Sequence, residues 1–174
     1  FIWDREDLSD IYTQPAAGGW PRRISFSRGL VAFWDDEIPR WSADGQWLAF
    51  TLDGHVHIVP AAGGLPVKIS DFASAASSPA WMPDSRRLIV SVERYEADQL
   101  VLTDCDGQWP RALTDDRLGD AWDARPSPDG LHVAYVFRHF ADLNRHDIRC
   151  IDLESGAIRT LAGQEREFNR SPRW

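Results

Sequence analysis

The feature that most constrains this chain is an internal repeat. Three segments align without gaps, beginning at residues 39, 79 and 124, and they read PRWSADGQWLAF, PAWMPDSRRLIV and ARPSPDGLHVAY. A fourth copy begins at residue 172, so successive copies start 40, 45 and 48 residues apart. Periods of this length with several short strands each indicate the blades of a β-propeller, and none of the segments has the 3.6-residue periodicity of a helical solenoid.

A second motif follows the copies and also precedes the first one. It reads AAGGWPRRIS at 16–25, AAGGLPVKIS at 61–70 and DGQWPRALT at 106–114, and a looser form spans 148–161. Glycine pairs and proline between apolar runs are typical of a hairpin that leads to an outer strand. Each blade is therefore expected to contain four short antiparallel strands.

The turns of one blade can be predicted from its residues. Ser42 and Asp44 can accept hydrogen bonds from nearby backbone N–H groups, and Gly45 accepts a positive φ. Asp53 and Gly54 form a tight hairpin signal. Ser85 replaces the glycine of the other copies, so either that turn differs or Ser85 adopts a positive φ with some strain.

We predict an all-β chain, a β-propeller fragment of four-stranded antiparallel blades, three complete and two partial. The complete blades are predicted at 38–70, 78–115 and 122–162, with a partial blade at 1–25 and the first strand of a further blade at 170–174. All belong to one propeller domain, and we expect the chain to be a piece of a longer protein. The side chains expected to be largely buried are Trp41, Leu48, Phe50, Trp81, Leu88, Val133 and Tyr135.

Composition excludes some classes of function. The formal net charge of −8 argues against nucleic-acid binding, and no apolar run approaches the roughly 18 residues of a membrane span. Cys105 and Cys150 provide neither a disulfide framework nor a metal quartet. His55 and His57 could share a strand face, as metal ligands sometimes do, but no third ligand accompanies them and we favour surface histidines. We expect no cofactor, and we interpret residues 104–107 as a turn and not as a calcium loop.

The pattern W-S-x-D-G-x-x-L-A-F followed by A-A-G-G-x-P-x-x-I-S resembles the TolB-like, or PD40, propeller repeat over essentially the whole chain. Within that group the chain looks most like the N-terminal propeller of bacterial family S9 serine peptidases, the relatives of prolyl oligopeptidase. Residues 35–41, 77–84 and 121–130 carry this second resemblance.

The resemblance to the peptidases implies a non-catalytic propeller that gates and positions peptide substrates. Catalysis would belong to a C-terminal α/β-hydrolase domain with a G-x-S-x-G motif, which this chain lacks. The implied partners are peptides and that catalytic domain, and the implied compartment is the cytoplasm. The alternative is a TolB-like scaffold that binds protein partners in the periplasm.

Acidic residues are the candidate substrate ligands. By the predicted strands, most of the 27 Asp and Glu residues fall on the face formed by inter-blade loops and by the turns between second and third strands. Loops of this kind often carry function, although exposed loops are also commonly charged. We expect Asp35, Asp36 and Glu37, with Asp120 and Asp123 on the next inter-blade loops, to attract the cationic amino terminus of a peptide.

Overall fold

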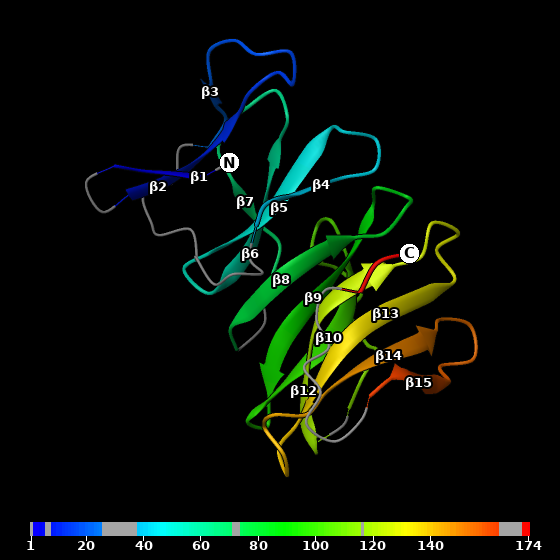
Figure 1. Ribbon diagram of the computed structural model, residues 1–174. Coiled ribbons are helices and arrows are strands. Elements are labelled where there is room, and N and C mark those ends of the chain that lie inside the picture. The colour runs from blue at the N-terminus through cyan, green and yellow to red at the C-terminus, as the bar shows by residue number, and fades with distance from the viewer. Residues whose placement is uncertain (1, 6–7, 26–37, 71–73, 116, 164–171) are drawn as a thin grey trace.

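The computed structural model describes residues 2–5, 8–25, 38–70, 74–115, 117–163 and 172–174, and these residues form strands and turns without a helix. The strands make four separate antiparallel sheets, each with its strands in chain order (Figure 1). The predicted all-β propeller architecture, with three complete blades and partial ones, is confirmed.

We number the sheets as blades one to four. Blade one has three strands, β1 (Ile2–Arg5), β2 (Leu8–Thr13) and β3 (Arg22–Arg23). Blade two has β4 (Arg40–Trp41), β5 (Trp47–Leu52), β6 (His55–Pro60) and β7 (Val67–Lys68). Blade three has β8 (Ala76–Trp81), β9 (Arg87–Arg94), β10 (Ala97–Asp104) and β11 (Arg111–Ala112). Blade four has β12 (Gly119–Pro126), β13 (His132–His139), β14 (His146–Asp152) and β15 (Ile158–Ala162).

In blades two and four the turn after the first strand is closed by a serine and an aspartate. In blade two the Ser42 hydroxyl donates to Asp44 Oδ1 at 2.6 Å and accepts from the Trp47 amide at 3.0 Å. The hydrogen bond from Ser42 is the largest effect that lowers the pKa of Asp44. In blade four Ser127 and Asp129 repeat this arrangement. These aspartates therefore shape turns.

Ser85 adopts a positive φ of 57°, whereas Gly45 and Gly130 have φ of 69° and 72° at the equivalent position. A non-glycine residue in this left-handed region is strained. The Ser85 hydroxyl accepts a hydrogen bond of 3.0 Å from the Asp44 amide of blade two. This bond between blades offsets part of the strain, because a glycine could not make it.

A buried hydroxyl anchors the outer hairpin of the first three blades. Ser25 accepts from the Ile11 amide at 2.8 Å, and Ser70 accepts from the Val56 amide at 2.8 Å. In blade three a threonine at the same position accepts from the amide of Leu100 at 2.9 Å. The Ile-Ser and Leu-Thr pairs of the second motif are explained by this bond, because a buried backbone N–H needs an acceptor.

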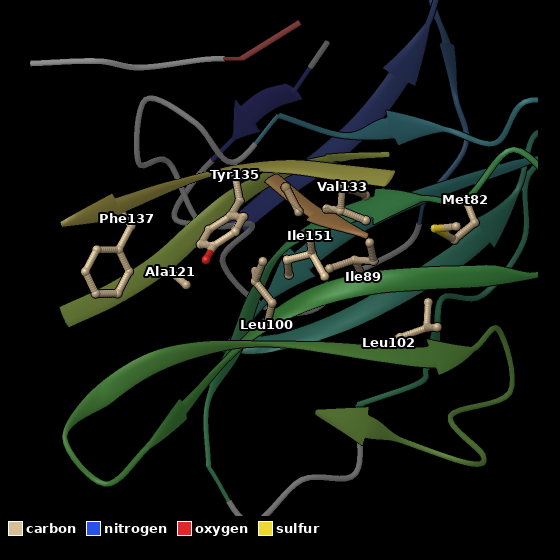
Figure 2. Close-up of a cluster of buried hydrophobic side chains, with 11 residues drawn as sticks. Met82, Ile89, Leu100, Leu102, Ala121, Val133, Tyr135, Phe137 and Ile151 are labelled. Atoms are coloured by element: carbon tan, nitrogen blue, oxygen red, sulfur yellow. The ribbon is translucent and has the colours of Figure 1, made fainter. Parts of the chain in front are cut away.

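Within the residues that the structure describes, the hydrophobic core forms three layers, one between each pair of neighbouring blades. In the layer between blades three and four, Tyr135, Val133 and Ile151 of blade four face Leu100 and Ile89 of blade three (Figure 2). Each blade thus buries its apolar face against the next, as the propeller architecture requires.

Six of the seven side chains predicted to be largely buried are buried, but the prediction for Trp41 is wrong. Trp41 is 50% exposed, whereas Trp81 at the same repeat position is 8% exposed. The Trp81 indole donates to the carbonyl of Arg40 at 3.0 Å, so it packs on the first strand of the preceding blade. In the described residues of blade one, β1 to β3 correspond to second, third and fourth strands, so Trp41 has no such strand beside it. It lines an open groove of about 910 Å³ instead.

Candidate functional site

The five acidic residues of the predicted site fall into two groups. Asp35, Asp36 and Glu37 lie outside the described residues. Asp120 and Asp123 both lie within β12, so the expectation that they occupy an inter-blade loop is wrong. The physical reason is that β12 pairs with β13 from Gly119 onward, where Gly119 is opposite His139. Both aspartates are also buried and do not form an exposed rim.

Asp120 connects blades three and four. Its carboxylate accepts a hydrogen bond from Arg138 Nε at 3.1 Å and contacts the same guanidinium through a second nitrogen. Arg138 is directly opposite Asp120 in the β12–β13 ladder. The other carboxylate oxygen accepts from the Asp98 amide of blade three at 3.0 Å. Asp120 is therefore held by an arginine of its own blade and by the backbone of the preceding one.

Two further carboxylates of blade three belong to the surroundings of Asp120. Asp98 is directly opposite Glu93 in the β9–β10 ladder. Burial, followed by the negative charges of Asp120 and Glu93, raises the pKa of Asp98 above its ordinary value, and only the Arg138 charge opposes this. The like charges make this edge of the two blades acidic, and they destabilise the ionised form of Asp98 relative to its protonated form.

Asp123 lies at a β-bulge. The β12–β13 pairing shifts register between Trp122 and Arg125, and Asp123 has a φ of 49°. Its buried carboxylate contacts the guanidinium of Arg125 and lies 3.7 Å from a guanidinium nitrogen of Arg40 in blade two. Ser78 occupies the equivalent place in blade three with a φ of 50° and a similar register shift. The bulge therefore recurs between blades, and blade four places a carboxylate there.

The sequence did not lead us to predict that arginines lie beside these two aspartates. Arg138 neutralises Asp120, and Arg125 together with Arg40 neutralises Asp123. A buried carboxylate needs such partners, because an isolated charge in the interior is strongly destabilising. One signal was available, since Arg40, Arg125 and Arg173 occupy the same second position of three repeat copies.

A metal centre has no support in the described part of the chain. No group of three or more His, Cys, Asp or Glu side chains is placed there so that it could hold an ion. His57 is partly buried, and this burial lowers its pKa. In the same residues, no helix has the length and apolar character needed to cross a bilayer.

Solved structures decide the fold. TolB from Acinetobacter baumannii superposes with a TM-score of 0.74 and 18% identity, over 93% of this chain and 40% of that one. The fold is a TolB-like β-propeller. A puromycin-hydrolyzing peptidase from Mycobacterium tuberculosis has a TM-score of 0.72 and 14% identity, over 95% of this chain and 32% of that one. Both identities are low, so these likenesses show the fold of the propeller alone.

Sequence comparison adds one curated relative. No protein-family model matches this propeller. The uncharacterized peptidase YuxL of Bacillus subtilis (strain 168) is 34% identical over 67 residues, which is 36% of this chain and 10% of that protein. The propeller thus spans about a tenth of the curated relative and less than half of either solved protein. Peptidases are accordingly among the proteins that are similar to it in sequence and in fold.

Proposed function

We propose that this chain is the substrate-gating propeller of an S9-type serine peptidase, and that it positions peptides for an α/β-hydrolase domain of the same protein. The observation that carries the proposal is the 34% identity to a peptidase, which is supported by a fold shared with a puromycin-hydrolyzing peptidase. A propeller supplies a rigid ring of strands, on which loops can select substrates for chemistry done elsewhere.

The substrate contact in this proposal is made by Asp35, Asp36 and Glu37. We assign Asp120 and Asp123 a structural part instead, because arginines already neutralise both carboxylates. A carboxylate that grips an ammonium group in a partly desolvated cleft makes a charge-assisted hydrogen bond. At an exposed rim the same pair contributes only about 0–1 kcal/mol and is screened by salt.

The test uses the product of the full-length gene with the double substitution Asp36→Asn and Glu37→Gln. The KM for peptides with a free amino terminus should rise severalfold, while N-acetylated peptides should change little. Asp53→Asn is the matched control, because Asp53 is an exposed acid on the β5–β6 hairpin. If the acids only steer the peptide, the rise in KM should shrink at high salt.

Two results would count against the proposal at different levels. If the full-length protein shows no peptide hydrolysis that is sensitive to a serine-directed inhibitor, the assignment as a serine peptidase is ruled out. A peptidase with unchanged KM for both kinds of peptide, at low and high salt, would leave the enzyme in place and remove the role of the acids.

A TolB-like scaffold that binds protein partners in the periplasm is the second candidate. The TM-score of 0.74 with TolB favours it, since this value is no lower than that with the peptidase. The first candidate would place the protein in the cytoplasm. Cell fractionation together with the inhibitor assay separates the two, because a scaffold would be periplasmic and inactive towards peptides.

A further inference from the structure

Three arginines and three tryptophans, from the first strands of the blades and from the C-terminal residues, lie around one pocket. Strand β8 contacts both β4 and β12, so the first strands lie next to one another around the side of the molecule that faces the propeller channel. The C-terminal residues lie over the ends of β8 and β13 (Figure 1). A pocket of about 390 Å³ there is lined by Arg40, Arg125, Arg173, Trp41, Trp81 and Trp174, together with an alanine and a proline.

Positively charged residues line the pocket. Among the residues that the structure describes, its lining includes three arginines and no acidic residue. Asp123 lies behind the lining, 2% exposed, and it contacts Arg125 and approaches Arg40. Three arginines thus line the pocket beside this buried carboxylate, in a chain whose overall charge is −8. An anion entering this pocket would therefore meet arginine side chains, although the whole molecule is acidic.

Two of the arginines are held in place. The Trp81 indole donates to the carbonyl of Arg40 at 3.0 Å, and the Trp174 indole donates to the carbonyl of Arg125 at 2.7 Å. Each tryptophan thus fixes the backbone of an arginine on a neighbouring strand. Asp123 orients the two guanidinium groups from behind, which lowers the entropic cost of binding a ligand between them.

Arg173 completes the site from the other side. It is exposed, and no ion pair is found for it within the part of the chain that the structure describes. Its position is equivalent to those of Arg40 and Arg125 in the repeat. The matching hydrogen bonds of Trp81 and Trp174 support the assignment of the C-terminal residues to a further blade, although residues 172–174 form no strand.

We propose that this pocket binds the C-terminal carboxylate of a peptide. A guanidinium is a planar fork of donors that matches a carboxylate, and three arginines line this pocket. The indole rings provide apolar walls for the last side chain of the peptide, and the volume suits a terminal residue rather than a folded partner. This proposal does not depend on the role of the acidic residues in the proposed function.

The test follows the indole N–H signals of Trp81 and Trp174 in ¹H–¹⁵N spectra of the 174-residue chain. N-acetyl-Ala-Ala-Phe with a free carboxylate should shift both signals in a saturable way, whereas the same peptide with a C-terminal amide should not. Inorganic phosphate is the third probe and should bind at least tenfold more weakly than the free acid. Equal binding of acid and amide, or of acid and phosphate, would overturn the proposal.

Substitutions test which residues contribute to the affinity for the free acid. Arg173→Gln should weaken binding of the free acid about tenfold, since a charge-assisted hydrogen bond is lost. Arg159→Gln is the control, because Arg159 is an exposed residue of β15 that is not among the residues lining the pocket, and it should leave binding unchanged. Arg40→Lys keeps the charge beside Asp123 and should fold normally, but it should also weaken binding because the planar fork is lost. Unchanged affinity in both Arg173→Gln and Arg40→Lys would refute the site.

Discussion

Replacing Trp81 by alanine tests how the blades are held together. Trp81 ends β8 and packs in the layer between blades two and three, where its neighbours include Ala49, Leu88 and Val90. Its indole also satisfies the carbonyl of Arg40 in the preceding blade. The substitution therefore removes a buried ring and a hydrogen bond between blades in one step.

The expected loss of stability follows from these contacts. Truncating a buried Trp to Ala costs about 3–5 kcal/mol, which includes the cavity that remains. Trp81→Phe keeps most of the ring packing but removes the hydrogen bond from the indole to the Arg40 carbonyl, so it should cost about 1–2 kcal/mol. Trp41→Ala is the matched control at the same repeat position. Its ring is 50% exposed, so we expect a loss on the order of 1 kcal/mol.

Urea unfolding followed by circular dichroism and by tryptophan fluorescence measures these differences. The two probes must give the same midpoint, because repeated units can unfold separately. In a thermal scan, Trp81→Ala should lower the Tm by roughly 10 °C, and Trp41→Ala by only a few degrees. Equal losses for the two alanine variants would refute the inference that the preceding first strand decides the burial of this tryptophan.

Three further predictions concern other parts of the chain. Asp98→Asn should raise the urea midpoint at pH 7, because the raised pKa of Asp98 means that its ionised form is disfavoured beside Asp120. The gain in midpoint should shrink as the pH falls towards the ordinary aspartate pKa of 3.8, because the wild-type carboxyl is then protonated as well. A gain that stays constant with pH would contradict this prediction. Gly107→Ala should cost more stability in the same assay than Gly156→Ala, since both glycines have a φ above 70° but only at Gly107 would a Cβ collide with a backbone carbonyl, that of Ile69 in blade two. The 174-residue chain alone should not hydrolyse an aminoacyl-nitroanilide. Hydrolysis that a serine-directed inhibitor blocks would contradict this prediction.

The features that the sequence predicted correctly are repetitive or local. The spacing of the repeat indicated propeller blades, and Ser42 and Asp44 in the first turn of blade two were identified from their pattern. Asp53 and Gly54 were expected to form a tight hairpin, and both have a positive φ. These features depend on hydrogen bonds and backbone angles within a few residues, so a short stretch of sequence contains the information.

The candidate site depended on contacts between blades. The sequence presents Trp41 and Trp81 as equivalent, yet only Trp81 lies against the first strand of a preceding blade. From the sequence, Asp123 was expected to be one of several acids on an inter-blade loop. In the structure it lies at a bulge and is buried beside Arg40, which is more than eighty residues earlier in the chain. Burial and ion pairing are properties of the packed assembly of blades, because they depend on which side chains and how much water surround a group. The repeat therefore determined the architecture of this protein, and the packing of one first strand on the next decided which of its charges and aromatic rings remain accessible to a ligand.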